Sequence, residues 1–587
     1  MMYSCRRYCV FLFSLLIGSS AIAKDIFIDP SRSTACPGAG TEADPYCDWR
    51  QVRQFVGGNR YLQKSGTVYR GSLQLIGDTD ASAEAPVFIG AYQSGPRPKI
   101  RIENPLPDAL NPQRWKRTHF NVWAYSTAGF RIGDPAVLLL DGRRAFGKAR
   151  QELDLCTRQG AQIIEWFHAG ETLSLCSPRG NPAEVYSSIS GMQRARGGEP
   201  WVPVYMENQH HVVLDGLALE GGNSGAVEIR GESSDIEIRN AVIGLDSASG
   251  IRAYSMTAPI RNLDIHDSLI DSGIRWGAVA YEPKVSGNGA HFLAGVQDSR
   301  IYRNIFIAWS HSGIYLDAHL PDSPGVNRNR VFDNEFHCGP HSSYFDYCRP
   351  LGIDGIKAGS AQHNVIFNNR MHDFSIASQV NGNNNYIVGN TCYNVINSKA
   401  RRRPTGQCFS LQPYKWSRDN LVANNTMAYT ADVAIQLIPG NGSVSSGHRV
   451  VGNIMYGCGL ATKPTRRDAC ISVAQDGSVG PQKLINNLMY NPGRSVRVLY
   501  RRDWSEEIGK LQSGYGDAIE ANRVTDPMFR NPAAGDFSLL AGSPAFGAGI
   551  PIDVPGLIVS GEAVNIGADQ SSPEAGTAPV AGWMLVP

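Results

Sequence analysis

The sequence has few charged residues for its length and almost no excess of either sign. Charged residues make up 18% of the 587 residues, and the formal net charge is +2. Two of the basic residues, Arg6 and Arg7, belong to the N-terminal leader described next, and the chain without them is formally neutral. A neutral chain offers no general electrostatic attraction for nucleic acid or an anionic membrane, so neither partner is expected.

The sequence also lacks an apolar run long enough to act as a membrane anchor. The run from Val10 to Ile17 is too short to span a bilayer, and it leads to Ala21-Ile22-Ala23, the small-x-small pattern of a signal-peptidase site. We therefore expect residues 1–23 to be a signal peptide, cleaved near Ala23, and the mature chain to be secreted or periplasmic. Neither Cys5 nor Cys9 follows the cleavage site directly, so no lipoprotein anchor is indicated.

No CxxC motif is present, which argues against zinc bound by paired cysteines. Ten cysteines follow the leader and fall into pairs that are close in sequence: Cys36 and Cys47, Cys156 and Cys176, Cys338 and Cys348, Cys392 and Cys408, and Cys458 and Cys470. An even number of cysteines in an exported chain favours disulfide bonds. We predict one disulfide for each pair, each closing a small loop, although spacing alone leaves other pairings open.

One pattern recurs from residue 210 onward, at intervals of 21 to 37 residues. It consists of Asn or Asp flanked, one spacer away on each side, by apolar residues, and its polar members are Asp215, Asn240, Asp267, Asn304, Asn334, Asn369, Asn390, Asn425, Asn453 and Asn487. Period-two alternation indicates strands, and Asn or Asp between them indicates a bend. A β-sandwich or propeller would need turn signals every 8–12 residues or a constant period of about 40–50. The pattern instead predicts an all-β right-handed parallel β-helix, with the polar residues stacked in a ladder.

A second strand follows each corner, and aligning these strands predicts which side chains point outward. One predicted outward column contains Val227, Arg252, Val279, Tyr315, Lys357, Ala377 and Ser410, and the next includes Tyr254, Tyr281, Asp317, Gln379 and Gln412. This alignment places Lys357 between Tyr315 and the small residue Ala377, with room for a sugar ring.

The regions without the corner pattern define the expected domain boundaries. We predict an N-terminal cap with the first coils at residues 24–104, an inserted β-rich subdomain at 105–204, the β-helix at 205–500, and a C-terminal cap at 501–587. Caps are expected because an open end of a β-helix is an unpaired sheet edge. The length would ordinarily suggest three or four domains, but a solenoid can use it as one elongated unit.

Several segments are similar to those of secreted β-helix proteins, including Phe27-Ile28-Asp29-Pro30 and Asp526-Pro527-Met528-Phe529. The chain resembles the right-handed parallel β-helix family of secreted polysaccharide lyases, the pectate lyase-like proteins. The sharpest match is Asp354-Gly355-Ile356-Lys357-Ala358-Gly359, which looks like the segment of family 9 pectate lyases that carries a catalytic lysine. A looser similarity to alginate lyases and chondroitinase B lacks their Arg-His-Gly motif, because residues 378–382 read Ser-Gln-Val-Asn-Gly here.

The resemblance implies an enzyme that cleaves a uronate-containing polysaccharide by β-elimination, with Lys357 as the base. A lysine can remove the C5 proton when desolvation or a neighbouring cation lowers its pKa. We name Asp317 and Asp354 as candidate ligands for Ca²⁺, which would neutralise the uronate carboxylate. Candidate substrate contacts are Tyr281, Tyr315, His319, Gln379, Gln412 and Arg402. We expect a monomer whose partner is an acidic polysaccharide.

Two other functions stay open on the same fold. A glycoside hydrolase needs two carboxylates about 5–9.5 Å apart, for which Asp317 and Asp354 are the candidates. A non-catalytic glycan-binding protein needs only a polar outward face, with Lys357 as an ordinary surface lysine paired to an aspartate. The fold alone does not decide among the three.

Overall fold

The computed structural model describes most of residues 23–585. Outside the described residues lie 1–22, 33–35, 37, 129–134, 145–146, 149–154, 157–164, 194–200, 223, 245–248, 272–286, 308, 310, 339–347, 356–359, 398–404, 412–415, 438–443, 461–468, 474–481, 502, 560–563, 572–582 and 586–587. Within the described part, no helix is long and apolar enough to cross a bilayer.

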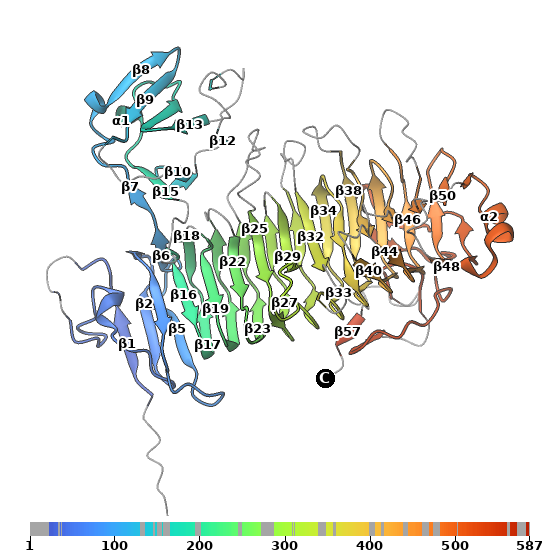
Figure 1. Ribbon diagram of the computed structural model, residues 1–587, viewed down its shortest axis with the longest axis horizontal. Helices are drawn as coiled ribbons and strands as arrows, with labels where there is room; N and C mark the ends of the chain where they lie inside the picture. The colour runs from blue at the N-terminus through green and yellow to red at the C-terminus, as the bar shows by residue number, and fades with distance from the viewer. Residues whose placement is uncertain are drawn as a thin grey trace, which may run out of the picture.

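Three long sheets run the length of the molecule, and successive strands of each sheet come from successive turns of the chain (Figure 1). Sheet A contains β1 (Asp25–Ile28), β2 (Arg60–Lys64), β5 (Val87–Tyr92), β17 (His210–Asp215), β20 (Ser234–Arg239), β23 (Ile260–His266), β27 (Arg300–Tyr302), β30 (Arg330–Phe332), β33 (Val365–Phe367), β37 (Tyr386–Val388), β41 (Leu421–Ala423), β45 (Arg449–Val451), β48 (Lys483–Ile485) and β52 (Ile519–Glu520), with β26 (Val296–Gln297) beside β23.

Sheet B contains β3 (Val68–Arg70), β6 (Lys99–Ile102), β18 (Ala218–Gly221), β21 (Val242–Gly244), β24 (Leu269–Asp271), β28 (Ile305–Ile307), β31 (Glu335–His337), β34 (Arg370–Phe374), β38 (Thr391–Val395), β42 (Thr426–Thr430), β46 (Ile454–Tyr456), β49 (Leu488–Tyr490) and β53 (Arg523–Val524). Sheet C contains β4 (Leu73–Ile76), β16 (Val204–Glu207), β19 (Val227–Arg230), β22 (Ser249–Tyr254), β25 (Asn288–Leu293), β29 (Ser312–Ala318), β32 (Arg349–Gly355), β35 (Ser378–Val380), β39 (Phe409–Leu411), β43 (Ile435–Leu437), β47 (Ile471–Val473), β50 (Val498–Tyr500) and β51 (Asp503–Ser505).

The chain passes through sheets A, B and C in turn, as in β17, β18 and β19, and then returns to sheet A in β20. Neighbouring strands of these sheets are parallel, apart from the antiparallel pair β50 and β51 at the C-terminal end of sheet C. One continuous apolar core, from Ile28 to Ile519, fills the interior. The predicted all-β right-handed parallel β-helix is therefore confirmed, and its ladders continue past residue 500 to β52 and β53.

A ladder of asparagine side chains runs along one corner of the helix, from Asn304 through 334, 369, 390, 425, 453 and 487 to Asn522. In each step, the Nδ2 of one asparagine donates to the Oδ1 of the asparagine on the next coil. The members are buried, so these amides satisfy backbone groups that the bend would otherwise leave without partners.

The predicted ladder is wrong at its N-terminal members, Asp215, Asn240 and Asp267. The strand register aligns Leu269 with Ile305, so Ser268 occupies the ladder position and Asp267 lies one residue earlier. That earlier position has a positive φ in successive coils, 50° at Asn240 and 52° at Asp267. Asn and Asp are favoured both there and in the ladder, so residue type alone did not separate the two positions.

A small β-rich unit is inserted between β6 and β16 and projects from the N-terminal end of the helix (Figure 1). One of its sheets contains β7 (Asn104–Pro105), β10 (Pro135–Leu140), β11 (Arg143–Arg144) and β15 (Ile189–Gln193); the other contains β8 (Trp115–His119), β9 (Val122–Ser126), β12 (Gly147–Lys148), β13 (Glu165–Ala169) and β14 (Thr172–Cys176). A short helix, α1 (Pro182–Val185), precedes β15. The unit has its own apolar core around Tyr125 and Trp166.

The C-terminal segment covers the end of the helix and two of its outer faces. Helix α2 (Ile508–Tyr515) packs on the last coil, and the pairs β54 (Phe529–Asn531) with β55 (Asp536–Leu539) and β56 (Leu557–Val559) with β57 (Trp583–Leu585) follow. Val554 and Leu557 pack on outward side chains of sheet A, and Phe529 and Phe537 pack on those of sheet B. Among the described residues, no corresponding apolar cluster covers the outer face of sheet C.

All five predicted disulfides are confirmed. The paired cysteines have Cα–Cα distances between 5.1 Å, for Cys458 and Cys470, and 6.3 Å, for Cys338 and Cys348. These distances suit disulfide geometry. Each bond joins residues 10 to 20 positions apart and so closes a local loop. Three of these loops, at Cys338–Cys348, Cys392–Cys408 and Cys458–Cys470, connect a strand of sheet B to the following strand of sheet C.

Candidate functional site

The outer face of sheet C carries a row of mainly polar side chains. In register, the row contains Tyr205, Glu228, Arg252, His291, Tyr315, Gly352, Gln379, Ser410 and Gln436. The residues that alternate with them, such as Ile314 and Ile353, are buried in the core. A second row beside it places Asp317 next to Asp354.

The predicted alignment of this face is wrong at Lys357. The residue beside Tyr315 on the next coil is Gly352, because β32 begins at Arg349 and its Asp354 pairs with Asp317. Val227, predicted to point outward, is buried and pairs with the core residue Ile251. The error arose because residues 355–357 read Gly-Ile-Lys, which matches Gly313-Ile314-Tyr315 as well as the true partner does.

Asp317 is the centre of the first group of polar contacts. Its side chain is almost completely buried and accepts hydrogen bonds from two imidazoles, from His291 Nε2 at 3.1 Å and from His319 Nδ1, and from the backbone N–H of His319 at 3.2 Å. Burial alone would raise the pKa of Asp317, but the hydrogen bonds from the two histidines outweigh it and lower the pKa to about 2. Asp317 is therefore ionised throughout the working pH range.

The two histidines that contact Asp317 differ in environment. His291 is buried, and burial lowers its pKa despite the hydrogen bond to Asp317, so its ring is neutral. The side chain of His319 is 51% exposed, and its hydrogen bond to Asp317 raises its pKa. Since Nδ1 of His319 faces the carboxylate, Nε2 is the nitrogen left for exchange of a proton with a ligand. This pair is suited to general acid–base chemistry.

Asp354 is the centre of a second group on the next coil. It accepts hydrogen bonds from the Tyr315 hydroxyl and from Asn381 Nδ2, the latter at 2.6 Å. Burial, followed by the nearby charges of Asp354 and Asp317, raises the pKa of Tyr315, so the phenol keeps its proton. The Tyr315 ring also stacks on the His291 ring, with 5.1 Å between the ring centroids, which links the two groups.

Arg349 completes the cluster from the start of β32. Its guanidinium lies 5.4 Å from the centre of the Tyr315 ring and contacts Ser312, His311 and Gln379. The sequence did not single out Arg349, His291 or Asn381. For His291 a signal existed, because Gly289-Ala290-His291 repeats the pattern of Gly313-Ile314-Tyr315, whereas the alignment used Gly277-Ala278-Val279 instead.

Five of the residues predicted from the sequence lie together in this cluster: Tyr315, Asp317, His319, Asp354 and Gln379. The predicted base Lys357 and the predicted substrate contacts Tyr281, Arg402 and Gln412 lie outside the described residues. Their roles stay predictions.

The predicted calcium ligands do not present free oxygen atoms. Both carboxylate oxygens of Asp317 and both of Asp354 accept hydrogen bonds from protein groups. Calcium prefers six to eight oxygen ligands, and the described residues contain no group of three or more His, Cys, Asp or Glu side chains arranged to hold a metal. As they are arranged, Asp317 and Asp354 do not fit the ion. Calcium binding at this site stays a prediction.

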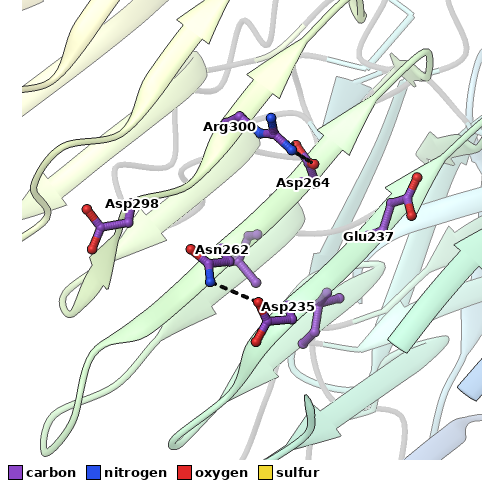
Figure 2. Close-up of a pocket in the computed structure, with 8 residues that line it drawn as sticks. Asp235, Glu237, Asn262, Asp264, Asp298 and Arg300 are labelled. Atoms are coloured by element: carbon purple, nitrogen blue, oxygen red, sulfur yellow. Dashed lines mark hydrogen bonds and ion pairs between the residues drawn. The ribbon is translucent and has the colours of Figure 1, made fainter. Parts of the chain in front are cut away.

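A pocket of about 370 Å³ lies on the outer face of sheet A, and its charged residues are arranged differently from those of sheet C (Figure 2). Four acidic residues line it, and basic side chains compensate three of them: Arg300 pairs with Asp264, and both Arg261 and Arg328 pair with Asp298. Glu237 pairs with Arg239 of its own strand and with His266 of the next coil. Most of these charge pairs link successive coils, which is a structural role, so we do not place the functional site in this pocket.

The fold is that of parallel β-helix proteins. No family model matches the chain, and no curated protein matches it. Similar solved structures include a complex of XylC with xylose (11% identity, 82% of this chain and 86% of that chain, TM-score 0.46), the pectate lyase Pel9A (11%, 93% and 96%, 0.38) and an alginate lyase from Paenibacillus sp. (11%, 73% and 95%, 0.35). At these identities the reaction has to be argued from the site itself.

Proposed function

We propose that the protein is a secreted or periplasmic polysaccharide lyase that cleaves a uronate-containing polymer by β-elimination on the outer face of sheet C. The observation that carries the proposal is the pair Asp317–His319, in which a buried, ionised carboxylate orients a half-exposed imidazole. This pair lies on the one long outer face where the described C-terminal segment forms no apolar cover. The leader sequence and the five disulfides support export.

The reaction requires two proton transfers. A base removes the C5 proton, the electron pair of that bond forms the C4–C5 double bond, and the C4–O4 bond breaks. The departing O4 takes a proton from an acid. His319 suits the acid, because its hydrogen bond to Asp317 raises its pKa and so favours the protonated ring, and Asp317 holds the ring through Nδ1.

Lys357 is the proposed base. Its support is the similarity of residues 354–359 to the lysine segment of family 9 pectate lyases and its position three residues after Asp354 in the sequence. A base must be unprotonated and an acid protonated, so this pair of roles predicts a bell-shaped dependence of kcat/KM on pH. The falling limb is expected to follow the titration of His319.

The test is a product assay with a panel of acidic polysaccharides, following the near-ultraviolet absorbance of the unsaturated ends. Lys357→Ala and His319→Ala should each lower kcat by about 10²–10⁴-fold, the usual contribution of a general base or acid. Matched controls are Lys483→Ala and His210→Ala, which replace the same residue types on sheet A. Full activity in Lys357→Ala would refute its role as the base, and no product from any polymer would refute the lyase.

A glycoside hydrolase is the second candidate, because Asp317 and Asp354 are direct neighbours in the register of β29 and β32. A hydrolase needs one carboxyl group that is protonated at working pH. The low pKa of Asp317 makes it unsuitable as that acid and leaves the task to Asp354. New reducing ends without near-ultraviolet absorbance would favour the hydrolase, and saturable binding without product would favour a glycan-binding protein.

A further inference from the structure

Arg349 is a buried cation whose described partners are all neutral. The residue is 4% exposed; its Nε donates to Ser312 Oγ at 2.9 Å, one Nη donates to His311 Nε2 at 3.1 Å, and the other donates to Gln379 Oε1. His311 is an acceptor at Nε2, and its Nδ1 faces Asn288 Oδ1 at 3.0 Å. Among the described residues, no carboxylate lies within ion-pair distance of Arg349.

This environment differs from that of arginine side chains that are partly buried. Arg101, whose side chain is 11% exposed, pairs with Glu220, and Arg230 pairs with Glu228. Removing a guanidinium from water without an opposite charge is costly, and such sites are commonly functional. The charge of Arg349 is therefore suited to a carboxylate that arrives with a ligand.

The neighbouring glycine places this cation within the candidate site. A Cβ atom at Gly352 would lie 2.8 Å from Cδ2 of Tyr315, which would force the ring to shift, and 3.1 Å from Cζ of Arg349, which would move the guanidinium by a few tenths of an ångström. The missing side chain thus lets the guanidinium occupy the row between Tyr315 and Gln379. From there it is adjacent to the ring whose hydroxyl binds Asp354.

We propose that Arg349 binds the carboxylate of the substrate and neutralises it during proton removal, so that the site needs no metal ion for this step. The inference rests on the proposed function and specifies its substrate as a sugar with a free carboxylate. A guanidinium pairs with a carboxylate through two parallel hydrogen bonds, which are stronger than its bond to the neutral Gln379 amide. The carboxylate would take the place of that amide oxygen.

Neutralisation explains how the pair would promote elimination. When the C5 proton leaves, negative charge moves onto the carboxylate oxygens, and a cation fixed beside them stabilises that charge. Calcium would serve the same purpose, but all four carboxylate oxygens of Asp317 and Asp354 are already hydrogen-bonded within the protein. Arg349 supplies the positive charge without displacing any of these bonds.

The experiment measures binding separately from turnover. Short oligosaccharides of galacturonate, mannuronate and guluronate, and their methyl esters, are titrated calorimetrically into full-length Lys357→Ala and into the same variant carrying Arg349→Gln. We expect Arg349→Gln to weaken binding of the free acids by at least about tenfold, the effect of losing a charge-assisted contact, and to change binding of the esters by less than about twofold. Arg349→Lys should restore part of the affinity for the acids.

A second arm measures activity with and without a chelator. The wild-type enzyme should keep its activity in EDTA, and Gly352→Ala, which displaces the guanidinium without changing any charge, should lower kcat/KM. Thermal midpoints close to that of the wild type establish that each variant is folded; where Arg349→Gln is unstable, Gly352→Ala and Arg349→Lys carry the test.

The possible outcomes separate this inference from the proposed function. Loss of elimination in EDTA with recovery on adding Ca²⁺, or equal losses of acid and ester binding in Arg349→Gln, would overturn the role of Arg349 and leave the lyase intact. Arg349-dependent binding of the acids without unsaturated product would overturn the lyase and leave Arg349 as the carboxylate-binding residue.

Discussion

Replacing one interior member of the asparagine ladder should strongly destabilise the β-helix. In Asn425→Ala the lost side chain accepts hydrogen bonds from Asn390 N–H at 2.9 Å and Asn390 Nδ2 at 3.0 Å, and donates to Ile387 O, Ala423 O and Asn453 Oδ1 at 2.9–3.0 Å. At about 1 kcal/mol net for each bond, and with no water to replace the buried partners, the free energy of unfolding should fall by about 3–5 kcal/mol.

The control is Ser268→Ala, which removes a hydroxyl from the same ladder position nearer the N-terminus. Ser268 Oγ accepts from Ala241 N–H at 3.0 Å and donates to His266 O at 2.8 Å, so the expected loss is about 1–2 kcal/mol. Both variants are compared by guanidinium denaturation, with hydrogen exchange of the Asn390 amide as a local measure. Equal losses in the two variants, or an unchanged exchange rate at Asn390, would show that the ladder does not stabilise the coils as argued.

Two further predictions concern stability. Burial lowers the pKa of His448 to about 3, below the ordinary 6.5, so the stability that its neutral ring contributes is full above pH 6.5 and is lost as the pH falls toward 3. His448→Asn should therefore make the thermal midpoint less sensitive to acid between pH 6.5 and 4, by up to about 1.4 kcal/mol of unfolding free energy per pH unit. An unchanged pH dependence would contradict this. Replacing both Cys458 and Cys470, which are 12 positions apart, by alanine should lower the free energy of unfolding by about 2–4 kcal/mol, and the difference from wild type should disappear when both proteins are measured fully reduced.

The fold could be predicted because each coil repeats the same residue types at its buried bend. A buried bend needs a side chain that donates and accepts in place of missing backbone partners, and asparagine does both. The same argument failed at Asn240 and Asp267, where a positive φ favours the same residue types for a different reason. A second ladder runs through Asn329, 364, 385 and 420 and continues through His448 to Gln482. The sequence pattern did not predict it, because histidine and glutamine replace asparagine in its last two members.

The site was predictable only in part, because it depends on the register of adjacent coils. Tyr315 and Asp317 were predicted to point outward from alternation within their strand, which holds whichever way neighbouring coils align, whereas Asp354 was named for its closeness to Lys357 in the sequence. Arg349 could not be identified in this way. Arg349 begins a strand, and its guanidinium reaches the outer face by folding back over Gly352, three residues later. The guanidinium has room there only because Gly352 lies beside Tyr315, and that pairing depends on the register of two coils.

The three outer faces of the helix use their polar residues differently, and that difference locates the function. On sheet A, arginines and aspartates alternate between coils and cancel one another, as Arg300 does with Asp264. On sheet B, the stacked rings of His337, His372 and Tyr393 continue into the C-terminal segment through Phe537. On sheet C, a buried cation and two buried carboxylates lie close together without forming an ion pair with one another among the described residues. Stability alone would favour pairing these charges, so their separation is best explained by a ligand whose own charge and protons complete the site.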